Sequence, residues 1–126
     1  MVDVSIYKNL QSDFVMIRFL YSDTVCDAAR LNRVKSDITM LRSILEEQSP
    51  NAHPLLLYCI EVLFEIIDEN NRVKVFDFAD LIHNMPEIYF GERTIRTFKR
   101  EIRIFNKKYK TKYFTEYIRL VHPQPV

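Results

Sequence analysis

Residues 95–109 read IRTFKREIRIFNKKY, and the apolar side chains in this stretch recur at alternating steps of three and four. The apolar positions are Ile95, Phe98, Ile102, Phe105 and Tyr109. This spacing is the period of an α-helix that buries one face against a protein core. The stretch therefore predicts an amphipathic helix, and the rest of the chain can be searched for the same pattern.

The same period recurs on both sides of this stretch. It predicts further helices over residues 7–21, from about 24 to 47, over 55–69 and over 75–85, and a short sixth segment through Phe114, Ile118 and Val121. Residues 14–21 are also rich in strand-forming side chains, so a strand there is the alternative. We expect an all-α fold, a compact bundle of five to six mostly antiparallel helices. Residues 1–121 would form a single helical domain, and 122–126 a loose C-terminal tail.

Several residues mark the expected helix boundaries. Thr24 and Asp27 are spaced like a capping box, and Pro54 suits the first position of a helix. Asn70-Asn71 ends a helix because asparagine tolerates the left-handed conformation, and Pro86 stops the next one. Gly91 is the single glycine, so tight β-hairpins and glycine-rich phosphate loops are excluded, and Gly91 itself is expected to act as a hinge.

The cysteines and the apolar runs indicate where in the cell the protein is expected. Cys26 and Cys59 lie in apolar, helix-like stretches without a nearby Cys or His, so we expect two small buried hydrophobes and neither a disulfide nor a zinc site. The opening residues carry neither a basic stretch nor an apolar stretch of the signal-peptide kind, so we expect no secretory signal, and the longest apolar run, 14–20, is interrupted by Arg18. We expect a cytoplasmic protein with no membrane contact, no cofactor and no small-molecule substrate.

Charge is distributed unevenly along the chain. Residues 1–91 contain 8 Lys and Arg against 14 Asp and Glu, a net charge of −6, whereas residues 92–126 contain 10 against 3, a net charge of +7. The overall charge of +1 therefore conceals a strongly dipolar sequence. Such asymmetry is typical of proteins that bind an acidic partner or a nucleic acid.

The basic side chains of the last third are the candidate site. They follow the helical period displaced by one residue from the apolar positions, and then alternate with aromatic residues: Arg93, Arg96, Lys99, Arg100, Arg103, Lys107, Lys108, Lys110 and Lys112. Cations complement phosphates, and exposed rings can stack on unpaired bases. The alternative is a merely solvated helix face, with Tyr109, Tyr113 and Phe114 packed inward. The burial of these three rings separates the two interpretations.

Residues 91–102 locally resemble the recognition helix of winged helix-turn-helix repressors. There a Ser-x-Arg-Thr-Ile-Arg-Arg stretch follows a helix similar to residues 78–82, and this chain has Glu92-Arg93-Thr94-Ile95-Arg96. The resemblance implies Arg and Thr side chains at DNA phosphates and base edges. It covers fewer than 30 residues. The connection through residues 84–91 is longer than in that family, and no glycine-rich wing follows Ile102.

Acidic side chains on two expected helices suggest a further alternative. Glu65-x-x-Asp68 followed by Asp77-x-x-Asp80 loosely resembles the Mg²⁺-binding carboxylates of all-α nucleotide pyrophosphohydrolases, and Asp80 and His83 share one helix face. That family uses Glu at its key positions, whereas the second pair here is Asp-x-x-Asp. Acidic residues are also ordinary on the polar face of a helix.

We therefore expect a small non-catalytic protein that acts by macromolecular binding, either to a protein partner or to a second copy of itself. A nucleic-acid-binding protein that uses the basic helix near residues 92–112 is the alternative. A metal-dependent hydrolase of the pyrophosphohydrolase type is a distant third.

Overall fold

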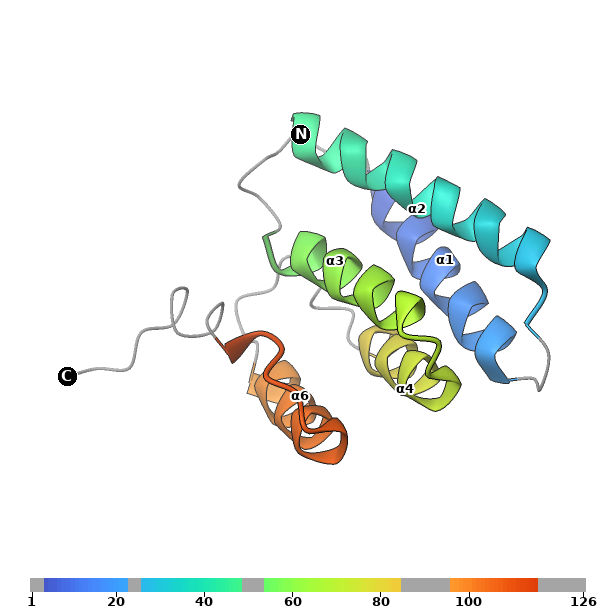
Figure 1. Ribbon diagram of the computed structural model, residues 1–126. Helices are drawn as coiled ribbons and strands as arrows, with labels where there is room; N and C mark the ends of the chain where they lie inside the picture. The colour runs from blue at the N-terminus through green and yellow to red at the C-terminus, as the bar shows by residue number, and fades with distance from the viewer. Residues whose placement is uncertain (1–3, 23–25, 49–53, 85–95, 116–126) are drawn as a thin grey trace.

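The computed structural model describes residues 4–22, 26–48, 54–84 and 96–115. These contain the helices α1 (Val4–Ser22), α2 (Ala28–Gln48), α3 (Pro54–Asp68), α4 (Arg72–His83) and α6 (Arg96–Tyr109). Consecutive helices alternate in direction, and α6 lies at one edge of the bundle beside α4 (Figure 1). The described residues form a compact all-α bundle and contain no strand, which confirms the expected fold class and settles residues 14–21 as helix.

The core lies between the helices at the positions that the period selects. Side chains from all five described helices pack into one continuous apolar cluster. Its largest fully buried members are Leu10, Phe14, Ile17, Ile38, Leu45, Leu56, Ile60, Leu63, Phe78, Phe98 and Phe114. Helix α3 is buried on most of its circumference because it lies between α2 and α4. None of the described helices is long and apolar enough to cross a membrane.

The helix boundaries agree with the expected ones at most described positions. Helix α3 begins at Pro54, and Asn70 ends it with a left-handed φ of 58°. Asn71 then caps α4 by accepting a hydrogen bond from the Lys74 amide at 3.2 Å. Helix α2 begins later than expected, at Ala28, because the Asp27 carboxylate accepts from the amides of residues 29 and 30. Asp27 is thus the N-cap itself.

Two expectations differ from the structure. Cys59 is fully buried, but Cys26 is only partly buried and precedes α2, so it is not a core residue within a helix. Both thiols are free. Phe114 is buried from a turn with φ 66°, directly before the helical residue Thr115, and the remainder of the expected sixth segment lies outside the described residues. Several residues for which the sequence allowed an expectation lie outside the described residues. They are Thr24, residues 85 and 86, Gly91, Ile118, Val121 and the expected tail 122–126.

Helices α1 and α4 form the most extensive helix pair of the bundle. Because they run antiparallel, the first residue of α4 meets the last turn of α1. There the Arg72 guanidinium donates to the carbonyl oxygens of Tyr21 and Ser22, at 3.1 and 2.9 Å. A cation at this end satisfies carbonyls that have no partner within the helix and complements the helix dipole. This contact fixes α4, on which α6 then packs.

Candidate protein-binding surface

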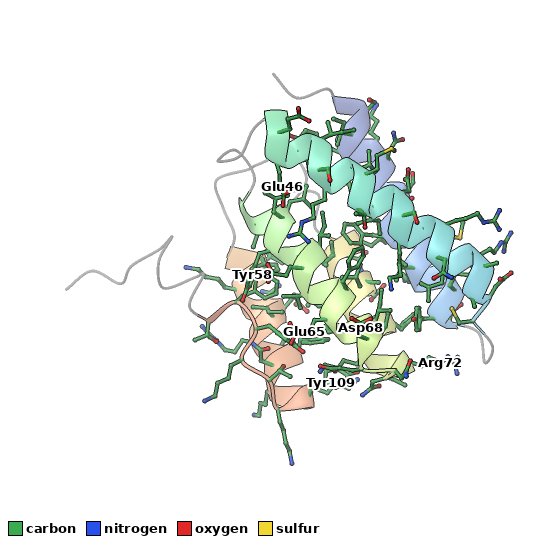
Figure 2. The ribbon with its side chains drawn as sticks, turned by 45° about the horizontal axis from the view of Figure 1, so that its top comes forward. Glu46, Tyr58, Glu65, Asp68, Arg72 and Tyr109 are labelled. Carbon is green, nitrogen blue, oxygen red and sulfur yellow. The ribbon has the colours of Figure 1, made fainter. Side chains whose placement is uncertain are left out.

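Helix α6 is held to the bundle by its apolar face. Phe98, Ile102 and Phe105 are buried, and the ring centroid of Phe105 lies 5.5 Å from that of Phe78 on α4. Phe98 meets Phe114 edge-on at 5.0 Å, so the turn after α6 is fastened to the same face. With one face buried in this way, the opposite face of α6 points to solvent. Long nitrogen-tipped side chains project from it, away from the other helices (Figure 2).

Of the nine predicted site residues, Arg100, Arg103 and Lys107 lie exposed on α6. Arg93 lies outside the described residues, and Arg96 begins α6 with a side chain that is not described. Lys99 is half-buried, and the exposed members of the set are Arg100, Arg103, Lys107, Lys108, Lys110 and Lys112. We call Lys99, Arg100, Arg103 and Lys107 the basic face. No member of the basic face has an acidic partner within 4.0 Å among the described residues except Arg100, which lies 3.6 Å from its neighbour Glu101.

Lys108 differs from the other cations because it turns back onto the bundle. Its Nζ atom lies 2.8 Å from the Asp77 carboxylate on α4, and the Tyr109 hydroxyl donates to the same carboxylate oxygen. The hydrogen bond to Asp77 raises the pKa of Lys108 above its ordinary value. Burial, followed by the hydrogen bond to Asp77, raises the pKa of Tyr109. Lys108 therefore joins the end of α6 to α4.

The three aromatic rings of the candidate site face inward. Phe114 is fully buried, with its ring edge-on to that of Tyr58 on α3 at 4.7 Å between centroids. Tyr109 and Tyr113 are half-buried against the core, and both hydroxyl groups form hydrogen bonds within the bundle. These rings therefore offer no stacking platform for unpaired bases. The basic face presents charge without those aromatic surfaces.

A buried lysine lies beneath the two tyrosines. Lys74 on α4 is 6 % exposed and is the one buried charged side chain among the described residues. Its Nζ atom lies 2.6 Å from the Glu69 carboxylate and 3.2 Å from the Tyr113 hydroxyl. Burial works to lower the pKa of Lys74, but the hydrogen bonds to Glu69 and Tyr113 outweigh it, so the pKa is raised. Lys74 remains charged and joins α3, α4 and the turn after α6.

Sequence reasoning did not select Lys74, although a signal was present. Lys74 precedes Phe78 by four residues and Ile82 by eight, so the helical period places it on the buried side of α4. A lysine at such a position requires an acidic partner. The partner, Glu69, lies beyond the turn at Asn70, and only the packing of α3 against α4 brings the two together.

The acidic side chains of α3 form a second exposed surface. Glu61, Glu65 and Asp68 are all exposed and lie along one side of the helix, and we call them the acidic strip. Figure 2 labels Glu65 and Asp68 on this helix. No Lys or Arg among the described residues lies within 4.0 Å of the acidic strip. The acidic strip and the basic face therefore do not neutralise each other within the described part of the chain.

The carboxylates suggested for a metal site are distributed differently. Asp77 is engaged by Lys108 and Tyr109, and Asp80 lies 2.7 Å from the Arg18 guanidinium of α1. In the described ranges, no three His, Cys, Asp or Glu side chains are grouped closely enough to hold a metal ion. Asp80 and His83 share a helix but gather no third ligand from those ranges.

Two hollows beside α6 could not be anticipated from the pattern of residues. One, of about 510 Å³, lies between α4 and α6 and includes Asp77, Asp80 and Glu101. The other, of about 330 Å³, lies between α6 and the turn that follows it and includes Lys99 and Arg103. Each depends on how far apart two packed segments lie, which the period of one helix does not report.

Among known proteins, no family model, no curated protein and no solved structure matches this chain.

Proposed function

We propose that this protein acts by macromolecular binding, with a second copy of itself as the favoured partner. The basic face of α6 and the acidic strip of α3 are the two surfaces that would meet. The observation that carries the proposal is that both are exposed, apart from the half-buried Lys99, and that among the described residues both lack partners of opposite charge, apart from the sequence neighbour Glu101. Exposed pairs within one chain contribute only about 0–1 kcal/mol each, whereas a symmetric dimer uses each pairing twice.

Exposed apolar side chains support an interface of mixed character. Phe19, Val73 and Ile104 are 58 %, 58 % and 57 % exposed, and Ile104 lies on α6 itself. Protein interfaces combine such side chains with charged groups at the rim. Charge pairing alone would be screened by salt, so apolar contact is expected to contribute to the affinity.

Sedimentation equilibrium tests the proposal. At tens of micromolar, the wild-type protein is expected to show about twice the 15.1 kDa mass of the chain. A variant with Arg100→Glu and Arg103→Glu should be monomeric, as should a variant with Glu61→Lys and Glu65→Lys, because each then presents like charges to its copy. An equimolar mixture of these two variants should form a heterodimer, since the reversed charges complement each other.

The matched control is Glu47→Lys at the exposed end of α2, which should leave the mass unchanged. A wild-type protein that stays monomeric at all concentrations would contradict self-association. So would failure of the two monomeric variants to associate when mixed, provided that both keep helical circular dichroism spectra.

A nucleic acid is the second candidate, and what supports it is the group of exposed cations around the basic face. Phosphate contacts make the logarithm of the affinity fall linearly with the logarithm of the salt concentration. We would test a short DNA duplex and a single strand at low salt, where non-specific binding is strongest. Absence of binding by the wild-type protein would remove this candidate. The pyrophosphohydrolase alternative requires Mg²⁺ or Mn²⁺, and we expect neither ion to raise the melting temperature.

A further inference from the structure

The hollow between α6 and the following turn has one basic wall and one hydroxyl-bearing wall. Lys99 and Arg103 line it from α6, and Thr111 and Thr115 line it from the turn. Lys99 and Arg103 are four residues apart, so they are neighbours on the same helix face. Among the described residues, no acidic side chain lines this hollow, whereas three line the hollow on the other side of α6. Its chemistry therefore favours an anion.

The wall opposite α6 is held in place by one side chain. The Asn106 amide nitrogen donates to the Tyr113 carbonyl at 3.0 Å, and its oxygen accepts from the Thr111 hydroxyl at 2.9 Å and the Tyr113 amide at 3.1 Å. The Thr111 amide also donates to the Asn106 carbonyl oxygen at 3.0 Å. The site is thus largely formed before any ligand arrives, which reduces the entropy cost of binding.

The two cations of the hollow are available for a ligand. Neither Lys99 nor Arg103 has an acidic partner within 4.0 Å among the described residues. Lys99 is half-buried, whereas Lys107 on the outer side is exposed. A carboxylate entering the hollow would meet two positive groups and the Thr115 hydroxyl.

The acidic strip carries a matching pattern. Glu61 and Glu65 are also four residues apart on an exposed helix face, so each helix presents two charges about one turn apart. Two carboxylates at this spacing can lie along α6 so that one of them reaches the cations of the hollow. The negative partner that fits the hollow is therefore present on the same chain.

We propose that this hollow is the specific contact of the self-association: it receives a carboxylate of the acidic strip of a second copy, held by Lys99 and Arg103. The inference rests on the proposed function and deepens it. Lys99 and Arg103 would then contribute more to the affinity of the dimer than the other cations do. The rest of the basic face supplies a weaker, longer-range attraction.

Single neutral substitutions on one helix test this assignment. Lys99→Gln and Arg103→Gln should each raise the dimer dissociation constant about tenfold or more, whereas Arg100→Gln and Lys107→Gln, with the same loss of charge, should raise it only about two- to threefold. Lys8→Gln on the exposed side of α1 is the unchanged control. Equal losses at all four positions on α6 would overturn the hollow as the specific contact, while leaving self-association through the basic face intact.

A small carboxylate probe tests the hollow as a binding site independently of self-association. Acetate, titrated into ¹⁵N-labelled protein, should shift the amide signals of Thr111 and Thr115 saturably, and the shifts should vanish in the Lys99→Gln/Arg103→Gln protein. If the wild-type chain proves monomeric, a second copy is excluded as the partner, but saturable acetate shifts would still support a carboxylate site in the hollow. Absence of these shifts would overturn the carboxylate site. If the protein binds duplex DNA and this binding depends on Lys99 and Arg103, the ligand of the hollow is a phosphate group. That result would overturn the proposal of a carboxylate ligand.

Discussion

Asp13 on α1 and Asp37 on α2 face each other across the junction of these helices. Both line a hollow of about 330 Å³, which Arg30 and Arg33 also border. One carboxylate oxygen of Asp13 is buried and accepts from no N–H or O–H group of the described residues. The two carboxyl groups can hydrogen-bond to each other only if one of them keeps its proton. Burial, followed by the contact with Asp37, raises the pKa of Asp13 to about 8.

This pair predicts a pH-dependent stability. The folded pKa of Asp13 lies above the unfolded value, so the folded chain binds more protons between about pH 4 and 8, and its free energy of unfolding falls as the pH rises through that range. Because Asp13 is only about half-buried, solvent screening reduces the effect to about 1 kcal/mol. Urea unfolding of wild type and Asp13→Asn at several pH values measures it. The variant should show a flatter profile and Glu47→Gln an unchanged one, and an unchanged profile in Asp13→Asn would contradict the shared proton.

Lys74 yields a second prediction at the residue scale. Lys74→Met keeps the length of the side chain but leaves the Glu69 carboxylate without its cation. Loss of these charged hydrogen bonds should lower the free energy of unfolding by about 1–3 kcal/mol. Urea unfolding at neutral pH measures the loss, with the exposed Lys8→Met expected to stay within about 0.5 kcal/mol. A loss at Lys74 no larger than at Lys8 would show that the buried contact contributes nothing to stability.

At the scale of elements, α6 is joined to the bundle by its apolar face, by Lys108 and by the turn that follows it. The turn contains two residues with positive φ that are not glycine, Lys110 at 56° and Phe114 at 66°. Such conformations cost energy and persist only where the surroundings hold them. Here the Asn106 hydrogen bonds and the burial of Phe114 do so.

Removal of the Asn106 side chain should therefore loosen the turn without melting α6. In Asn106→Ala, hydrogen exchange of the Tyr113 amide should accelerate, because the oxygen that accepts from it is gone. The free energy of unfolding should fall by about 1–3 kcal/mol. Asn84→Ala, which removes an exposed bond at the end of α4, is the matched control and should leave the Tyr113 amide unchanged. Equal protection of that amide in both variants would show that Asn106 does not hold the turn.

At the scale of the whole molecule, the contrast between a net charge of −6 in residues 1–91 and +7 in residues 92–126 predicts a salt-sensitive association. Mobile ions screen exposed charges beyond about 10 Å at roughly 0.1 M ionic strength. The dimer dissociation constant should therefore rise between low salt and about 0.5 M, and then level off where apolar contact dominates. Sedimentation across this range measures it. A dissociation constant that is independent of salt would place the interface on the apolar side chains and away from the basic face.

The sequence by itself was enough to predict the helices and most of the core. Helical period is a local property, because side chains three and four residues apart share a face whatever else the chain does. The spacing of Phe98, Ile102 and Phe105 therefore predicted a buried stripe, which the structure confirms. The left-handed end of α3 at Asn70 and the start of that helix at Pro54 are local in the same sense. The uneven charge of the chain also follows from composition alone.

Tertiary structure alone decided where side chains at the margins of these faces point and which partners they meet. Tyr113 was open to either interpretation until the turn after α6 carried its hydroxyl to Glu69 and Lys74, 44 and 39 residues away. Asp13 and Asp37 are ordinary polar-face residues until two helices bring them together. Both hollows beside α6 exist only as spaces between packed segments. Such encounters depend on the distance and angle between elements, and no period within a single helix encodes them.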